Sequence, residues 1–219
     1  DPKKPGRIWG DAERLGKGVR WMQRSKITEG FVDEAIPFMK KAAEAKKPFY
    51  VNLWPDDVHS PFWPPVDKWG NGKRELYLQV LREMDRQFGK LFDFVRDDDT
   101  LRENTLVLIC SDNGPELGAG VAGPFRGYKT HLYEGGVRSS LIAWGPGLIP
   151  SNNNESTGKV NRKSVFSAVD LVPTLLDLAD VAHPKGVKYD GESLPDVLLG
   201  ISDASRKQPL LFRRPPDRD

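Results

Sequence analysis

The chain has 219 residues, and its 38% hydrophobic content and mean hydropathy of -0.53 are ordinary for a globular protein, which excludes disorder along the whole chain. Its 33 basic residues against 31 acidic residues give a formal net charge of +2, too small to attract nucleic acid or an anionic membrane by bulk charge. Cys110 is the only cysteine, which excludes an internal disulfide and a thiolate-rich metal site.

Hydrophobic periodicity predicts two helices in the first half of the chain, with a strand between them. Apolar residues recur every three or four positions over residues 28–45, despite the internal Pro37, and again over residues 76–95. Between these segments, the aromatic and β-branched run Phe49–Trp54 predicts a short strand flanked by prolines. The acidic run at residues 97–99 is expected to lie beyond the end of the second helix.

The second half of the chain continues this alternation of helices and strands. Thr105–Cys110 is almost continuously apolar, which is typical of a central strand covered on both faces. Leu141–Trp144 predicts another strand, and residues 165–178 predict a helix. This order favours an α/β fold with a mostly parallel sheet sandwiched by helices, where ligands bind at the loops beyond the carboxyl ends of the strands.

The two ends of the chain carry no targeting or membrane segment. No apolar run is long enough to span a bilayer, and the opening at residues 1–6 lacks the apolar stretch of a signal peptide. Because the opening is polar and proline-rich and the close at residues 213–217 is equally abrupt, we expect a truncation at both ends.

The first polar motif, Asp112-Asn113-Gly114, comes directly after a predicted strand. A carboxylate and an amide carbonyl at the edge of a sheet suit a hard cation such as Ca²⁺ or Mg²⁺. The same three residues are also ordinary turn chemistry, because Asx side chains bond the backbone and glycine adopts a positive φ. Taken alone, this motif favours the turn.

The second motif is a loop, residues 127–138, which holds Lys129, His131 and the pair Gly135-Gly136. The compact charge of a lysine can hold an anionic ester and stabilise negative charge in a transition state, while glycines allow the backbone to turn tightly. The alternative is a solvated loop lysine, which is more common.

The third motif, residues 54–61, holds His59 just past a predicted strand. Its ordinary pKa lies close to neutrality, so a histidine here can protonate a leaving oxygen or bind an oxyanion. Asp56 and Asp57 in the same loop could be metal ligands, but adjacent acids in a proline-rich loop are more often solvated, and neither is counted among the site residues.

Together, these three segments resemble the sulfatase family of the alkaline phosphatase superfamily. The pattern is a strand leading to a His-x-Pro loop, a strand leading to Asp-Asn-Gly-Pro-Glu, and a Lys-x-x-x-x-Glu-Gly-Gly-x-Arg loop, in that order. Residues 167–178 and 189–194 look like the helix and loop that follow in the family. The resemblance runs from about Phe31 to Phe212 and implies an alkaline-phosphatase-like fold that is incomplete here.

The resemblance implies a role for each matched residue. Asp112 and Asn113 would be ligands of a divalent cation, Ca²⁺ or Mg²⁺. Lys129 would contact the sulfate, and His59 would bind sulfate or the leaving oxygen, so both are expected to be catalytic and substrate-binding residues.

The sequence departs from the family pattern at the nucleophile. Members of the family carry Cys-x-Pro-x-Arg or Ser-x-Pro-x-Arg, whose first residue becomes formylglycine, whereas Cys110 here precedes Ser-Asp-Asn and no such segment exists. The family's N-terminal acidic metal ligands are absent too. We therefore expect residues 1–205 to be the C-terminal part of a sulfatase catalytic domain and residues 206–219 to begin a truncated C-terminal subdomain. Formylglycine is expected only in a missing N-terminal part, and this fragment alone should be inactive.

Two alternatives stay open at this point. The resemblance implies that the parent protein is a sulfuric ester hydrolase. The first alternative is a phosphodiesterase or phosphonate hydrolase of the same superfamily, and the second is a non-catalytic paralogue that binds a sulfated glycan. The resemblance implies a small-molecule or carbohydrate sulfate ester as the partner, with no nucleic acid and no membrane span. Since family members are commonly exported, it also implies a periplasmic or secreted location.

Overall fold

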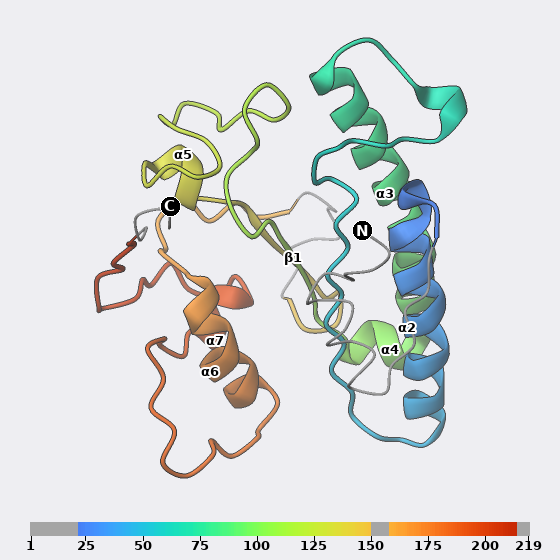
Figure 1. The fold of residues 1–219 in the computed structure, drawn as a ribbon. Helices are drawn as coiled ribbons and strands as arrows, with labels where there is room; N and C mark the ends of the chain where they lie inside the picture. Colours follow the sequence, from blue (N-terminus) through green and yellow to red (C-terminus); the bar gives the residue numbers. More distant parts are fainter. Residues whose placement is uncertain (1–21, 150–157, 214–219) are drawn as a thin grey trace, which may run out of the picture. The chain divides into compact units, whose positions relative to one another are not determined.

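The computed structural model describes residues 22–149 and 158–213 (Figure 1). The chain divides into two compact units, Asp1–Phe92 and Asp93–Asp219, and the boundary falls inside the helix α3 (Lys73–Asp97). Within the described ranges, no helix combines the length and the apolar character needed to cross a membrane.

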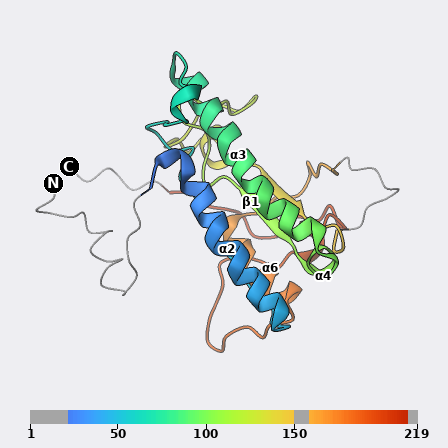
Figure 2. The same ribbon diagram turned by 90° about the vertical axis from the view of Figure 1, so that its right-hand side faces the viewer.

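Two helices dominate the first unit. The short 3-10 helix η1 (Arg24–Lys26) leads into α2 (Ile27–Glu44), whose first turn lies against residues 87–90 of α3 (Figures 1 and 2). Both helices fall within a few residues of the predicted ranges, because their apolar residues recur at the helical period and form a buried stripe. The buried side chains on these helices in the first unit include Thr28, Val32, Ala35, Met39, Val80, Gln87 and Leu91.

Gln87 fixes the start of α2 against α3. Its side chain is fully buried, its amide oxygen accepts a hydrogen bond from the Glu29 backbone N–H over 2.7 Å, and its amide nitrogen donates to the Ser25 carbonyl over 2.6 Å. Lys90 on α3 pairs with the Glu29 carboxylate at 2.7 Å. A buried amide with both ends satisfied specifies one register between the two helices.

The segment between α2 and α3 contains a single short 3-10 helix, η2 (Val66–Lys68). The strand predicted at Phe49–Trp54 is not formed, because these residues have no pairing partner among the described strands. The prediction was wrong here because β propensity reports only that a segment fits a sheet, while a strand also needs a neighbour to pair with.

The second unit holds a two-stranded sheet. Strands β1 (Val107–Cys110) and β2 (Leu141–Trp144) pair antiparallel, with Val107 opposite Trp144 and Cys110 opposite Leu141. This pair differs from the mostly parallel sheet expected from the sequence. The connection, residues 111–140, contains only the single-turn helix α5 (Glu134–Val137) and so lacks the longer helix that usually joins parallel neighbours.

Strand β1 is also more open than predicted. Ile109 is 38% exposed and Cys110 is exposed, so the described residues do not cover both faces of this strand. A continuous apolar run identifies a strand, but it carries no information about which layers lie over it.

Capping residues set the boundaries of the helices around the sheet. Helix α3 includes Asp97, so the expectation that residues 97–99 lie beyond its end was wrong for this residue. Asp98 lies between the helices and caps the following helix α4 (Asp99–Asn104) by accepting the Leu101 N–H over 2.9 Å. Helix α6 (Ala168–Leu178) starts later than predicted because Ser167 and Asp170 form a reciprocal capping box.

The short helix α7 (Pro195–Leu198) follows a loop that packs on the start of α6. Asp170 on α6 accepts the Glu192 backbone N–H over 2.8 Å, and the Arg206 guanidinium lies 3.6 Å from the same carboxylate. Gly191 lies so close to the Val169 carbonyl that a Cβ atom would collide with it. This loop therefore has a structural role in the second unit.

Candidate functional site

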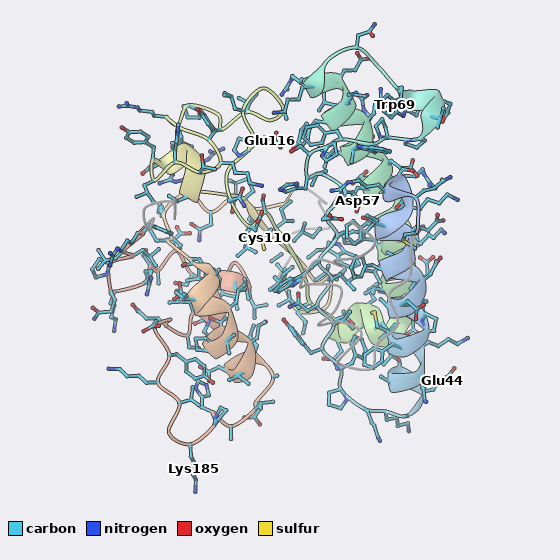
Figure 3. The ribbon with its side chains drawn as sticks, in the orientation of Figure 1. Glu44, Asp57, Trp69, Cys110, Glu116 and Lys185 are labelled. Atoms are coloured by element: carbon cyan, nitrogen blue, oxygen red, sulfur yellow. The ribbon has the colours of Figure 1, made fainter. Side chains whose placement is uncertain are left out.

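Three of the four predicted site residues lie in the second unit, between β1 and β2. Asp112 and Asn113 follow β1 directly, and Lys129 lies on the loop that leads into α5. Figure 3 labels Cys110 at the end of β1 and Glu116 on the loop beyond it, which bracket the predicted metal motif. His59 lies in the first unit, on the segment between α2 and α3.

Backbone hydrogen bonds join the two loops of the second unit. The Gly114 N–H donates to the Gly136 carbonyl over 2.8 Å, and the Lys129 N–H donates to the Pro115 carbonyl over 2.9 Å. Because Pro115 follows Gly114, the Lys129 backbone lies beside the end of the Asp-Asn-Gly motif. The structure therefore brings Asp112, Asn113 and Lys129 into one connected set of loops.

Three glycines allow close backbone packing in these loops, with Gly114 at the contact between the loops and Gly135 and Gly136 packed against backbone of the Lys129 loop itself. A Cβ atom on Gly114 would collide with the Gly135 carbonyl oxygen and lie 2.9 Å from the Gly136 Cα. A Cβ on Gly135 would meet the Arg126 carbonyl oxygen at 2.7 Å, and one on Gly136 would meet the Tyr128 carbonyl oxygen at 2.6 Å. Backbone atoms form all these contacts, so no side-chain movement relieves them. The glycines serve close backbone packing in addition to the tight turn expected from the sequence.

The predicted metal ligands offer oxygen atoms that fit a hard cation. Asp112 is exposed and Asn113 is half-buried, and no hydrogen bond or ion pair within residues 22–149 and 158–213 engages either side chain. The loop itself is held by hydroxyls, because Ser111 donates to the Asn113 carbonyl over 2.9 Å and Ser139 donates to the Ser111 carbonyl over 2.8 Å. A carboxylate and an amide oxygen on a fixed loop match the donor chemistry of Ca²⁺ or Mg²⁺.

These two residues supply only part of a coordination sphere. In the part of the chain that the structure describes, no three His, Cys, Asp or Glu side chains gather closely enough to hold a metal ion. Since Ca²⁺ takes roughly 6–8 oxygen ligands, Asp112 and Asn113 need further donors to complete the site.

Within residues 22–149 and 158–213, no acidic side chain pairs with Lys129. It is half-buried, and among the described residues its ammonium forms no ion pair. Arg138 at the end of the same loop differs, because it pairs with the Glu134 carboxylate at 3.2 Å and stacks 4.5 Å above the Phe125 ring. The lysine charge is therefore available to an anionic ligand, while Arg138 anchors the loop.

Stacked rings brace the loop around Lys129. The Tyr128 and His131 ring centroids lie 4.0 Å apart, and Tyr133 meets the His131 ring edge-on at 6.1 Å. The His131 backbone N–H donates to the Tyr128 carbonyl over 3.0 Å, whereas its ring Nδ1 is buried without a hydrogen-bond partner in the described structure. Thr130 adopts a positive φ of 80°, so the chain turns sharply directly after Lys129.

His59 is exposed and held in one ring orientation. Its Nδ1 lies 2.8 Å from the Ser60 carbonyl, and since a carbonyl only accepts, Nδ1 carries the hydrogen. In the neutral ring, Nε2 then bears the lone pair, and after protonation it donates a hydrogen. The Arg24 guanidinium fixes this loop by donating to the Asp56 carbonyl over 2.7 Å and to the His59 carbonyl over 3.1 Å.

The two acidic residues beside His59 have structural partners. Asp56 pairs with Arg24 at 3.0 Å. Asp57 is only 2% exposed, and it accepts the Thr28 hydroxyl over 2.8 Å and the Thr28 backbone N–H over 3.4 Å. Asp57 is therefore buried, unlike most acidic residues of a proline-rich loop. Burial raises the pKa of its carboxyl above the ordinary value, even though the Thr28 hydrogen bonds act in the opposite direction.

The sequence motifs did not single out Arg126. Its guanidinium lies 4.1 Å above the Tyr133 ring, and its carbonyl accepts the Gly135 N–H over 2.8 Å. The signal available in the sequence was an arginine three residues before the motif lysine, followed by an aromatic residue that it can stack on.

Comparisons with known proteins identify the family of this chain. The family model described as Sulfatase matches residues 15–181. N-acetylgalactosamine-6-sulfatase of Canis lupus familiaris is 34% identical over 195 residues, which cover 87% of this chain and 35% of that protein. Arylsulfatase G of Mus musculus is 32% identical over 200 residues, covering 84% of this chain and 36% of that protein. The chain thus spans about a third of the length of these relatives.

Two solved structures share the fold. The BT33336S-sulf protein, from work on glycosaminoglycan metabolism by Bacteroides thetaiotaomicron, superimposes with a TM-score of 0.70 at 25% identity, covering 88% of this chain and 40% of that one. The PsFucS1 sulfatase from Pseudoalteromonas sp. superimposes with a TM-score of 0.67 at 28% identity, covering 87% and 39%. The fold is therefore an incomplete alkaline-phosphatase-like α/β fold. Because the family match extends over most of the sequence and includes the loops of Asp112 and Lys129, the chain belongs to the sulfatase family.

Proposed function

We propose that the whole protein hydrolyses a sulfate ester, and that this chain provides the sulfate-binding lysine and two ligands of the metal. The observation that carries the proposal is the backbone contact between the Asp112–Gly114 loop and the Lys129 loop, made by three glycines. This contact joins the loop that carries the two oxygen donors to the backbone of a lysine with no acidic partner among the described residues, which supports the proposal. A cation and a lysine together suit an ester that carries a negative charge.

Each residue has a definite task in this proposal. The Lys129 ammonium binds the sulfate and stabilises the negative charge that grows on its oxygens as the ester bond breaks. His59 binds sulfate or the leaving oxygen, and protonated Nε2 donates the proton that the departing alcohol needs. Asp112 and Asn113 hold Ca²⁺ or Mg²⁺ through their side-chain oxygens.

The metal, when bound, supplies a further positive charge that polarises the sulfate oxygens. The nucleophile, formylglycine, has no counterpart in this chain, because no Cys-x-Pro-x-Arg or Ser-x-Pro-x-Arg segment is present. We therefore propose that this chain alone is inactive and that a preceding part of the catalytic domain carries the nucleophile and the remaining metal ligands. Residues 1–205 then belong to that domain, and residues 206–219 begin a further subdomain.

The substrate class follows from the relatives. One relative is named for N-acetylgalactosamine 6-sulfate chemistry, and one structural neighbour comes from work on glycosaminoglycans, so we propose a sulfated carbohydrate as substrate. The family resemblance also supports a periplasmic or secreted location.

The test begins with the natural sequence that precedes Asp1, where we expect Cys-x-Pro-x-Arg or Ser-x-Pro-x-Arg. The purified full-length protein is then assayed with 4-nitrocatechol sulfate, a sulfated N-acetylgalactosamine and a bis-aryl phosphate. We expect sulfate release that EDTA abolishes and Ca²⁺ restores. Cleavage of the phosphate diester without sulfate release would identify a phosphodiesterase, and binding of the sulfated sugar without release would identify a non-catalytic paralogue.

The metal ligands need their own variant. Asp112→Ala should weaken Ca²⁺ binding, measured by calorimetry on the full-length protein, because it removes the only carboxylate of the predicted pair. Asp203→Ala is the matched control, since Asp203 is an exposed aspartate in an ion pair with Lys163. Equal calcium affinity in both variants would contradict the assignment of Asp112.

A further inference from the structure

Arg126 is the second cation of the Lys129 loop that has no acidic partner among the described residues. It is exposed and lies three residues before Lys129, and its backbone is fixed to Gly135 by a hydrogen bond of 2.8 Å. Of the three cations in this loop, Arg138 pairs with Glu134 at 3.2 Å, whereas neither Arg126 nor Lys129 pairs with a carboxylate in the described structure. The loop therefore presents two positive charges that its own acidic residues do not neutralise.

The Arg126 guanidinium is also held in place before any ligand binds. It lies 4.1 Å above the Tyr133 ring, and that ring meets His131 edge-on at 6.1 Å. His131 in turn stacks on Tyr128 with ring centroids 4.0 Å apart. Stacking already restricts the guanidinium before a ligand binds. The side chain of Arg126 therefore loses less conformational entropy on binding an anion than an unstacked surface arginine would.

These observations identify the chemistry of the ligand. A guanidinium presents a planar fork of donors that matches the two oxygens of a carboxylate or of a sulfate. Lys129 is assigned to the sulfate that reacts, so a second cation on the same loop fits a second anionic group on the same molecule.

We propose that Arg126 is a specificity-determining residue that binds a second anionic group, a carboxylate or a further sulfate, of a sulfated saccharide held at Lys129. The inference rests on the proposed sulfatase function and deepens it. It explains why Arg126 stacks on Tyr133 and has no acidic partner in the described loop, while Arg138 is neutralised by Glu134.

The experiment measures competitive inhibition of 4-nitrocatechol sulfate hydrolysis by the full-length protein. The three inhibitors are N-acetylgalactosamine 6-sulfate, its 4,6-disulfate, and the disaccharide that joins a uronic acid to the 6-sulfated sugar. We expect at least one of the two doubly charged inhibitors to bind about tenfold tighter than the monosulfate. One added charge-assisted hydrogen-bonded pair between Arg126 and the second anionic group provides an affinity gain of this size. Which of the two binds tighter identifies sulfate or carboxylate as the second group.

Arg126→Gln should reduce this preference to near one, while Arg126→Lys should keep part of it. Arg138→Gln is the matched control, because Arg138 also stacks on a ring but is already neutralised, so it should leave the ratio of inhibition constants unchanged. If Arg126→Gln does not fold, the wild type provides the test. Its preference for the doubly charged inhibitor over the monosulfate should then decrease as ionic strength rises from about 0.02 M to about 0.5 M.

Three results would overturn the inference. The first is equal affinity of the wild type for all three inhibitors. The second is a preference for a doubly charged inhibitor that Arg126→Gln or added salt leaves unchanged. The third is an equal loss of affinity for all three inhibitors in Arg126→Gln. Failure of the wild type to hydrolyse any sulfate ester is a different outcome, since it rejects the proposed function on which the inference rests.

Discussion

Gly114 allows the two loops of the candidate site to approach each other closely, and Gly135 and Gly136 allow the Lys129 loop to pack closely on its own backbone. The atoms that each added Cβ would meet belong to backbone, which moves less readily than the end of a side chain. The two glycines of the Glu-Gly-Gly motif are thus explained by packing within the loop that carries Lys129.

Replacement of Gly114 tests this packing. Gly114→Ala should lower the free energy of unfolding by about 2–3 kcal/mol, because the new Cβ collides with the Gly135 carbonyl. Gly89→Ala in the middle of α3 is the control, since its Cβ meets nothing within 4 Å, and it should raise stability by about 0.5–1 kcal/mol. Urea unfolding of both variants measures the difference, and a Gly114→Ala protein as stable as the wild type would contradict the packing.

Asp57 gives a pH-dependent prediction. Burial raises its pKa in the folded state, so the folded protein binds more protons than the unfolded chain between the two pKa values. The stability that this group contributes is therefore fully present below the unfolded pKa of about 3.9 and is lost as pH rises through the folded pKa.

Asp57→Asn should remove this dependence, because an amide does not titrate and its oxygen still accepts a hydrogen bond from Thr28. Urea unfolding of wild type and variant over a pH series from about 3.5 to 7 should give a wild-type stability that falls relative to the variant as pH rises. A difference that stays constant, or that increases with pH, would show that the Asp57 pKa is not raised.

At the scale of elements, one buried ion pair holds the C-terminal loop on α6. Asp170 is 0% exposed and Arg206 is 4% exposed, and Asp170 also caps the helix and accepts the Glu192 N–H. Loss of one partner of such a pair leaves the other charged and buried.

Asp170→Ala should therefore lower the free energy of unfolding by about 3–5 kcal/mol. Asp203→Ala, which breaks the exposed pair with Lys163, should change it by less than about 1 kcal/mol. Thermal and urea unfolding measure both variants, and similar small effects would mean that the Asp170 contacts contribute little to stability.

The elements also show how far the sequence alone predicts this structure. Helices α2 and α3 and strand β2 were predicted closely because their periodic or β-branched patterns are local properties. The antiparallel pairing of β1 with β2 and the missing strand at residues 49–54 depend on partners far away in sequence, which periodicity does not reveal. The late start of α6 depends on its Ser167–Asp170 capping box.

In the candidate site, too, local motifs could be predicted from the sequence and tertiary contacts could not. Motif order was sufficient to identify Asp112, Asn113 and Lys129 as candidates, and the structure adds that their loops touch through glycine backbone. The Arg126–Tyr133 stack and the buried Asp57 were not predicted, because each depends on a tertiary contact between side chains and neighbouring atoms.

At the scale of the whole molecule, this chain belongs to the sulfatase family but corresponds to only part of its relatives. The chain spans about a third of its curated relatives, and its two predicted metal ligands are too few for a complete calcium site. Its part in the proposed reaction is therefore to provide positive charge and metal ligands around the sulfate.

The most direct test of this account is the kcat/KM of the full-length protein for a sulfate ester, measured for Lys129→Ala. The account predicts a loss of about 10²–10³-fold with an unchanged melting temperature, because Lys129 stabilises charge in the transition state. Lys163→Ala, which removes an exposed lysine, should retain the wild-type value. A Lys129→Ala protein with wild-type kcat/KM would contradict the assignment of Lys129 and, with it, the central claim.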